Sequence, residues 1–382
     1  MSKNRIIPLS EIGEIITGNT PKTSDTENYE SNDIPFLKPS DFSTDNIDLF
    51  DTEFYISEKA RNKARVLPVG SIVVTCIGII GKTKITQKEC AFNQQINAII
   101  PFNGNNNRYI AYAISFQKEL LQTKANAAVV PIINKTEFSK ISIPLPPLET
   151  QRKIASNLDK VTHTIDLCNA ILEKLDLLVK SRFVEMFGTG EHKLHKLKDV
   201  CAKITDGEHG TVERFETGRL YLMARNITAD NQIDLSEVSY ISDEDHNRIY
   251  ARCNPEYGDL LLVCVGATIG KMALVPQMES FSMARSVALI KPNKTCLNSI
   301  FLMASMQSQN VQVQIKNSIH SSAQGGLYTK SIQNLSIPLP PLELQQQFAA
   351  FIEQTDKSKS AVKQVLEKAE TLKRALMQEY FG

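Results

Sequence analysis

The sequence predicts an α+β protein: two similar mixed α/β domains joined by two long antiparallel helices that form a coiled coil, with an internal pseudo-twofold duplication. The nonapeptide Ile-Ser-Ile-Pro-Leu-Pro-Pro-Leu-Glu at residues 141–149 returns as Leu-Ser-Ile-Pro-Leu-Pro-Pro-Leu-Glu at 335–343, an offset of 194 residues. Glu-Met-Phe-Gly at 185–188 and Glu-Tyr-Phe-Gly at 379–382 repeat at the same offset. The chain therefore runs domain, helix, domain, helix.

These repeats set the expected boundaries. We place the first domain at residues 1–147, a central helix at 148–188, the second domain at 189–341 and a C-terminal helix at 342–382. Both helices open with Pro-Pro-Leu-Glu. Proline tolerates the first turn of a helix, where its missing N–H costs no hydrogen bond, and glutamate there complements the helix dipole.

Each domain contains an apolar, β-rich run bounded by glycines, at residues 70–78 and 258–266, which predicts a buried strand. Helical patterns follow at 109–123 and 299–314. Each domain is therefore expected to combine a strand-rich front with helices behind it.

Apolar side chains in the first long helix follow a 4-3-4-3 spacing, the pattern of a coiled-coil seam. The second helix continues this spacing, with a polar patch in its first half. Because both stripes need cover from water, we expect the helices to pair with each other. The expected seam residues are Ile154, Leu158, Val161, Ile165, Cys168, Leu172, Leu175 and Val179, and Phe351, Thr355, Ser358, Val362, Val365, Ala369, Leu372 and Leu376.

The composition is that of a soluble globular protein, with 382 residues, 42% hydrophobic and 22% charged. The start of the chain does not resemble a signal peptide, and the most apolar runs are about half as long as a membrane span requires. Seven scattered cysteines without a Cys-x-x-Cys motif indicate a reducing compartment and no zinc site. We therefore expect a cytoplasmic protein.

The net charge of +1 hides an uneven distribution along the chain. Residues 11–58 contain 12 acidic and 2 basic side chains, whereas residues 59–140 contain 3 acidic and 12 basic ones. The second domain repeats this change of sign less sharply. A nearly neutral chain can carry a basic face, which is the hypothesis here; the alternative is that folding mixes the two signs on every surface.

No motif indicates catalysis. Gly-Lys-Thr at residues 81–83 resembles the end of a phosphate-binding loop, but Cys76 stands where the first glycine belongs. Asn-Pro-Glu-Tyr at 254–257 departs from the adenine-methyltransferase tetrapeptide at its third position. The six histidines show no metal-ligand spacing. We therefore expect neither a catalytic residue nor a metal site.

Two variable α/β domains, each closed by Pro-Leu-Pro-Pro-Leu-Glu-x-Gln and a long helix, with Gly-x-x-x-Gly-Lys at 266–271, resemble the specificity subunit of a Type I restriction-modification system. The resemblance implies that each domain is a target recognition domain for one half of a bipartite, asymmetric double-stranded DNA site. It also implies a non-catalytic subunit without its own cofactor. Two methyltransferase subunits would bind S-adenosylmethionine, and separate restriction subunits would use ATP and Mg²⁺.

Side chains that match base edges and phosphates give the candidate contacts. Amides pair with adenine, arginine pairs with guanine, and lysines bind phosphates. The candidates for base contacts are Asn93, Gln94, Gln95, Arg225, Asn226, Arg285 and Gln324, and those for phosphates are Lys38, Lys82, Lys84 and Lys271. Two alternatives remain: a two-headed protein-recognition scaffold that dimerises through its helices, and a bifunctional nuclease or methyltransferase.

Overall fold

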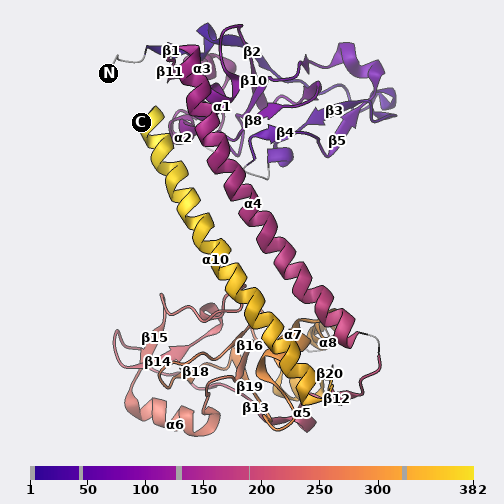
Figure 1. Ribbon diagram of the computed structural model, residues 1–382, viewed down its shortest axis with the longest axis vertical. Helices are drawn as coiled ribbons and strands as arrows, with labels where there is room; N and C mark the ends of the chain where they lie inside the picture. The colour runs from indigo at the N-terminus through magenta and orange to yellow at the C-terminus, as the bar shows by residue number, and fades with distance from the viewer. Residues whose placement is uncertain (1–4, 43–45, 126–130, 189, 321–324) are drawn as a thin grey trace. The chain divides into compact units, whose positions relative to one another are not determined.

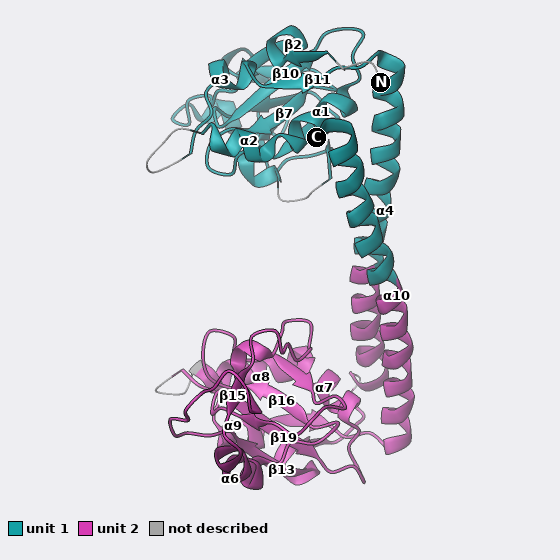
Figure 2. Cartoon of the chain, turned by 90° about the vertical axis from the view of Figure 1, so that its left-hand side faces the viewer, with its two compact units in different colours: residues 1–171, 362–382 teal, residues 172–361 magenta. Residues whose placement is uncertain are grey.

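The chain forms two compact units (Figure 2). The computed structural model describes residues 5–42, 46–125, 131–188, 190–320 and 325–382. Unit 1 combines Met1–Ile171 with Val362–Gly382, and unit 2 is Leu172–Ala361. The two long helices are thus divided between the units, so that each unit contains the start of one helix and the end of the other.

Unit 1 is built around a five-stranded sheet in the order β2-β10-β7-β8-β4 and a four-stranded sheet in the order β5-β3-β9-β6. A short antiparallel pair, β1 with β11, joins the first strand to the chain segment before the long helix. The strands are β1 (Ile6–Pro8), β2 (Gly13–Thr17), β3 (Ile34–Leu37), β4 (Asp48–Leu49), β5 (Phe54–Ile56), β6 (Val66–Leu67), β7 (Ile72–Thr75), β8 (Thr83–Thr86), β9 (Cys90–Phe92), β10 (Ile96–Pro101) and β11 (Ser142–Pro144).

Unit 2 repeats this plan with one strand fewer in each sheet. The strand orders are β13-β19-β16-β17 and β15-β14-β18, and β12 pairs with β20. In both units the second sheet contains one parallel pair, β3 with β9 and β14 with β18. The strands are β12 (Leu194–Lys196), β13 (Cys201–Asp206), β14 (Arg219–Leu222), β15 (Ser239–Ile241), β16 (Leu260–Val263), β17 (Met272–Leu274), β18 (Ser282–Met283), β19 (Val287–Pro292) and β20 (Ser336–Pro338).

The central strands β7 and β16 are buried on both faces, which explains their continuous apolar sequence. In β16, Leu260 and Leu262 belong to the core beneath the helices, whereas Leu261 and Val263 belong to the core beneath the second sheet. In β7, Val73 and its neighbours divide between two cores in the same way. Each main sheet therefore supports helices on one side and the second sheet on the other.

Helices cover one side of each main sheet. The helical patterns predicted at 109–123 and 299–314 each form two helices, with breaks at Gln117 and Ser308. Unit 2 also has two helices before its buried strand, where the described residues of unit 1 form 3-10 turns. The helices are α1 (Asn107–Phe116), α2 (Lys118–Thr123) and α3 (Lys135–Ser139) in unit 1, and α5 (Leu197–Val200), α6 (Asp243–Cys253), α7 (Ser299–Gln307), α8 (Gln309–His320) and α9 (Thr329–Asn334) in unit 2.

The long helices α4 (Leu148–Phe187) and α10 (Leu342–Phe381) each contain 40 residues and pack together in opposite directions (Figure 1). The seam predicted for α4 is buried or half-buried throughout. The seam predicted for α10 is partly wrong, because Ser358, Val365 and Leu372 are exposed. The inward positions lie one residue later, at Lys359, Leu366 and Lys373. Polar residues occupy several of these positions, so the apolar spacing alone did not identify the seam.

The last turn of each long helix fills a core of the unit in which it ends. In unit 1 the Phe381 ring lies 5.3 Å from Tyr109 and 6.0 Å from Phe116, measured between ring centroids. In unit 2 the Phe187 ring lies 4.9 Å from Phe301. The repeated Phe-Gly ends therefore act as core residues of both units.

The glutamine of each Leu-Glu-x-Gln sequence is buried and holds the start of a domain helix. The Oε1 atom of Gln151 accepts from the Asn106 backbone N–H at 2.9 Å, and Gln345 makes the same bond with Asn298 at 2.9 Å. Asn106 and Asn298 are the N-caps of α1 and α7. The repeated signature thus fixes each domain to the helix that follows it.

Candidate nucleic-acid interface

Both units present the same tight turn between the second sheet and the main sheet. It connects β9 to β10 in unit 1 through Asn93–Gln95, and β18 to β19 in unit 2 through residues 284–286. The backbone N–H of Asn93 donates to the Leu37 carbonyl at 3.1 Å, and that of Ala284 donates to the equivalent Leu222 carbonyl at 2.9 Å. The turns are therefore structurally equivalent, which aligns Gln94 with Arg285.

The three amides predicted in the first turn do not share one role. Asn93 is buried and folds back on the turn, where its side chain bonds both the backbone N–H and the side chain of Gln95 at 3.0 Å. Of the three, only Gln94 is exposed, and its Oε1 atom accepts from the Thr20 hydroxyl at 2.6 Å. Asn93 is thus a structural residue, a correction to its predicted role as a base contact.

The second unit divides its candidates in a similar way. Arg285 is exposed at the tip of its turn, and its backbone N–H donates to the Glu208 carbonyl at 2.9 Å. Arg225 is exposed as well, and its guanidinium donates to Ser239 at 2.9 Å. Asn226 is only 1% exposed and bonds the backbone on both sides, so its prediction as a base contact is wrong. Gln324 lies outside the described residues.

The two lysines that follow the glycine turns are equivalent in the backbone. The Lys82 carbonyl accepts from the Thr75 N–H at 3.0 Å, and the Lys271 carbonyl accepts from the Val263 N–H at 2.8 Å. The glycines before them, Gly81 and Gly270, have φ of 85° and 96°, a left-handed conformation that glycine adopts without strain. The one-residue difference in loop length is therefore absorbed before the lysine.

Lysine side chains in unit 1 are largely engaged within the protein. The Lys82 ammonium donates to the Phe42 carbonyl at 2.7 Å. Lys84 is 3% exposed and donates to the Asn46 carbonyl at 2.8 Å, so its predicted phosphate contact is wrong. Lys38 places its ammonium 3.1 Å from the centre of the Phe54 ring, a cation–π contact. Lys38 and Lys82 would have to leave these partners to reach a phosphate.

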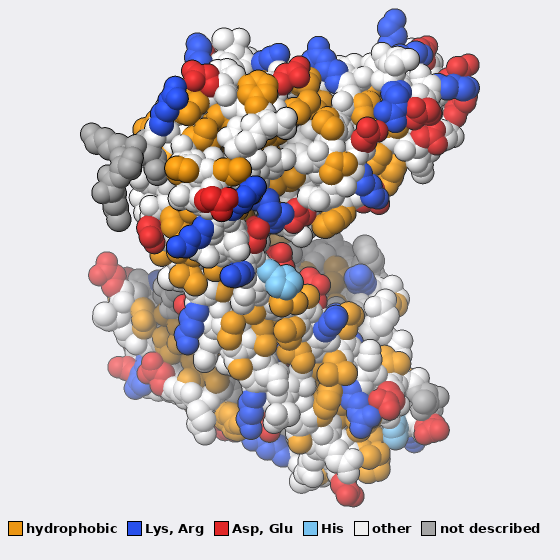
Figure 3. Space-filling model, turned by 45° about the horizontal axis from the view of Figure 1, so that its top comes forward, with side chains coloured by type: hydrophobic (Ala, Val, Ile, Leu, Met, Phe, Trp, Pro, Cys, Tyr) orange, Lys and Arg blue, Asp and Glu red, His pale blue; other side chains and the backbone are white. Residues whose placement is uncertain are grey.

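Folding mixes the acidic and basic stretches of unit 1. Lys63 pairs with Asp25 at 3.3 Å, and Arg108 bridges Asp48 and Asp159 at 2.7 Å each. On the face drawn in Figure 3, lysine and arginine side chains lie among aspartate and glutamate side chains. The linear charge pattern therefore gives no uninterrupted basic face there, and the alternative stated above holds for this view.

Two exposed arginines beside the turns were not predicted from the sequence. Arg65 donates to the Thr17 carbonyl at the end of β2, and Arg252 donates to the equivalent Asp206 carbonyl at the end of β13 at 3.0 Å. No shared sequence pattern marks them, because Arg65 follows a 3-10 turn (Glu58–Lys63) whereas Arg252 lies within α6. Each tight turn thus has a guanidinium on the adjacent strand end.

The described residues contain no group of three or more His, Cys, Asp or Glu side chains arranged to hold a metal. All seven cysteines are free, and burial raises the pKa of the Cys76 and Cys264 thiols to about 12, which keeps these thiols protonated at neutral pH. No helix in the described ranges is long and apolar enough to span a bilayer.

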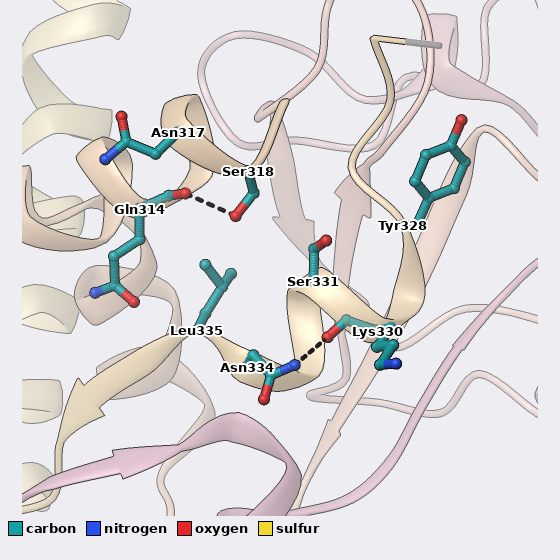
Figure 4. A pocket seen from close by; sticks show the side chains of 8 residues that line it. All are labelled: Gln314, Asn317, Ser318, Tyr328, Lys330, Ser331, Asn334 and Leu335. Atoms are coloured by element: carbon teal, nitrogen blue, oxygen red, sulfur yellow. Dashed lines mark hydrogen bonds between the residues drawn. The ribbon is translucent and has the colours of Figure 1, made fainter. Parts of the chain in front are cut away.

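A pocket of about 690 Å³ lies between α8 and α9 in unit 2 (Figure 4). Its lining is rich in amides and hydroxyls, with Leu335 at its base and the Lys330 ammonium near its edge. The Asn334 side chain donates to the Lys330 carbonyl at 2.8 Å. Among the described residues, those that line the pocket include no carboxylate, cysteine or histidine.

Comparison with known proteins gives the family. The model of the Type I restriction modification DNA specificity domain matches residues 1–177 and again 193–371. The chain is 31% identical to the Type I restriction enzyme MjaIX specificity subunit of Methanocaldococcus jannaschii, over 46% of this chain and 43% of that protein, less than half of either. It is 23% identical to the EcoBI specificity subunit of Escherichia coli, over 98% of this chain and 85% of that protein.

A solved structure has the same fold. The S subunit of a Type I restriction-modification system from M. genitalium superposes with a TM-score of 0.66 at 13% identity, covering 100% of this chain and 97% of that one. Both matched segments of the family model contain one mixed α/β domain and most of one long helix. The chain therefore belongs to the Type I restriction modification DNA specificity domain family and contains two copies of that domain.

Proposed function

We propose that this chain is the subunit that gives a Type I restriction-modification complex its DNA sequence specificity, and that its two domains read two unlike halves of one split site. The observation that carries the proposal is the pair of equivalent turns, which expose different side chains, Gln94 and Arg285, on the same scaffold. Equal scaffolds suit two identical partner subunits, and unlike turns suit two unlike DNA sequences.

The long helices support a role in assembly. Several large apolar side chains on them remain exposed although the seam is closed, among them Leu177 at 60% and Val184 at 63%. Surface patches of this kind favour contact with another protein. We propose methyltransferase subunits as that partner, with restriction subunits joining the same complex.

Catalysis belongs to those partners in this proposal. This assignment is supported by the named relatives, which are specificity subunits. S-adenosylmethionine would bind to the methyltransferase subunits, and ATP with Mg²⁺ to the restriction subunits. This chain would contribute DNA contacts and the attachment surface.

The test is DNA binding by the chain assembled with its methyltransferase partner. Mapping methylated adenines in DNA from the source cell gives the candidate site, and duplexes with that site or with one half scrambled are then compared. We expect both halves to be required, and affinity to fall with salt by about 0.9 log units per log unit of salt for each phosphate neutralised. Assembly without any DNA preference would favour the protein-recognition scaffold instead, and methyl transfer by the isolated chain would favour an enzyme.

A further inference from the structure

The turns between β9 and β10 and between β18 and β19 share several backbone bonds, although the bond from the Arg285 N–H to the Glu208 carbonyl has no counterpart at Gln94 among the described residues. Besides the bonds described above, the Cys76 N–H donates to the Gln95 carbonyl and the Cys264 N–H to the Ser286 carbonyl, both at 2.9 Å. Because these bonds fix both sides of each turn, the backbone of the middle residue has one orientation. The middle residue is Gln94 in unit 1 and Arg285 in unit 2.

The residue after β2 in unit 1, and after β13 in unit 2, packs closely against the turn and fixes it further. The backbone N–H of Gly18 donates to the Ile96 carbonyl at 3.1 Å, and that of Gly207 donates to the Val287 carbonyl at 3.1 Å. A Cβ atom would lie 2.1 Å from the Asn93 carbonyl oxygen at Gly18 and 2.2 Å from the Met283 carbonyl oxygen at Gly207. Only glycine fits at such separations, so both strand ends require it.

The side chains at the middle of the turn differ in chemistry. Gln94 carries a neutral amide with a donor and an acceptor, which matches the N6 and N7 positions of adenine. Arg285 carries a planar fork of donors, which matches the O6 and N7 acceptors of guanine. No hydrogen bond or ion pair of the Arg285 guanidinium is present among the described residues. Among the same described residues, the Gln94 amide nitrogen donates no hydrogen bond, whereas the amide oxygen accepts one from the Thr20 hydroxyl.

The neighbouring amides and arginines do not offer the same combination. Asn93 and Asn226 are buried, and the Arg225 guanidinium is bonded to the Glu237 carbonyl and the Ser239 hydroxyl at 3.0 and 2.9 Å. The middle of the turn is therefore the equivalent position at which both units expose a side chain able to read a base.

We infer that Gln94 and Arg285 occupy one shared specificity position, at which unit 1 selects adenine and unit 2 selects guanine in their respective half-sites. The inference rests on the proposed function, because it assigns a base to each half of the split site. Exposed Arg65 and Arg252 on the adjacent strand ends would contact the phosphates beside these bases.

Reciprocal substitution tests the inference in the complex with the methyltransferase partner. Gln94→Arg is expected to change one adenine of one half-site to guanine in the methylation map, and Arg285→Gln to change one guanine of the other half-site to adenine. Each should leave the other half-site unchanged. The preference between adenine and guanine at the affected position should change by about 10-fold to 100-fold, the range of one bidentate contact.

Two exposed residues away from the turns provide matched controls. Gln122→Arg, at the end of α2, adds the same charge as Gln94→Arg, and Lys294→Gln, beyond the end of β19 opposite the turn, removes one positive charge as Arg285→Gln does. Both controls should retain the original map. A variant that no longer methylates is assayed for binding to duplexes carrying each of the four bases at every position, and the altered preference must appear at one position.

The outcomes separate this inference from the proposed function. If the wild-type complex methylates a split site and both turn variants keep its base sequence, the shared specificity position is wrong while the proposed function stands. A change of preference at several positions, or in the opposite half-site, also overturns it. If the wild-type complex shows no preference for any split site, the proposed function itself fails.

Discussion

At the residue scale, buried polar groups hold the two domains to their helices. Gln345 is fully buried, accepts from Asn298 and donates to the Pro340 and Cys296 carbonyls at 2.8 and 2.9 Å. A buried polar atom that loses its partner keeps the cost of its desolvation. This one side chain therefore satisfies three backbone groups from two segments, residues 296–298 and Pro340.

We predict that Gln345→Ala destabilises unit 2 by about 1–3 kcal/mol, because it leaves these buried backbone groups without a partner. The measurement is the free energy of unfolding from urea titration. Gln346→Ala and Gln347→Ala, the next two residues on the same helix, are controls with exposed side chains and should change it by less than about 0.5 kcal/mol. An equal loss in all three variants would contradict the role of burial.

A second prediction concerns pH and the buried His246. Burial and the nearby Arg219 lower the pKa of this imidazole, which lies 3.0 Å from the Ser282 hydroxyl. The unfolded chain binds the proton at about pH 6.5 while the folded chain resists it, so protonation favours unfolding. The stability that neutral His246 contributes is complete above that pH and is lost as pH falls through it.

We therefore expect the melting temperature of the wild-type protein to fall between pH 7.5 and 5.5, and the fall to be smaller in His246→Asn. Exposed His163 provides a matched control, since His163→Asn should keep the wild-type dependence. Differential scanning calorimetry at several pH values measures all three proteins. Parallel curves for the wild type and His246→Asn would refute the assignment.

At the element scale, the last turn of each long helix belongs to a core built largely by other parts of the chain. Phe381 is 6% exposed and packs on Tyr109 and Phe116, while Phe187 is 4% exposed and packs on Phe301 and Phe348. The aromatic contacts explain why both helix ends keep phenylalanine. The Phe-Gly repeat is therefore a packing element, in addition to marking where each copy ends.

We predict that Phe381→Ala costs about 3–5 kcal/mol in unit 1, the usual loss for a buried phenylalanine. Hydrogen exchange followed by mass spectrometry should show faster exchange in α1 and unchanged exchange in α7. Phe187→Ala should give the reverse pattern, and so serves as the matched control. Faster exchange in both helices for either variant would mean that the cores do not respond independently.

The sequence predicted the elements far better than the contacts at the site. Repeats and apolar periodicity identified both long helices and the buried strands, because these features depend on local spacing. They could not show that Asn93, Asn226 and Lys84 are buried, since burial is set by chain segments distant in sequence. The predicted seam of α10 was wrong at Val365 because a charged residue occupies a seam position that the apolar pattern could not identify. Lys359 lies inward, and its ammonium is bonded to Asp176 at 2.6 Å.

At the scale of the whole molecule, the spatial units differ from the repeated halves of the sequence. Unit 1 needs Val362–Gly382 from the end of the chain, whereas unit 2 is one continuous segment, Leu172–Ala361. A protein truncated after Ala361 should therefore keep the hydrogen-exchange protection of unit 2 and lose that of α1 and of the first part of α4. Adding a peptide of residues 362–382 should restore it. Protection of unit 1 without that segment would contradict the division.

The placement of Phe381 in the core of unit 1 has a consequence for synthesis on the ribosome. Domains usually fold as the chain emerges, with the N-terminal part first. Here the N-terminal unit stays incomplete until the final residues appear, roughly 10–40 s after Ile171 at ordinary elongation rates. During that interval the nascent protein exposes apolar surface around Tyr109, which makes it a candidate client for chaperones.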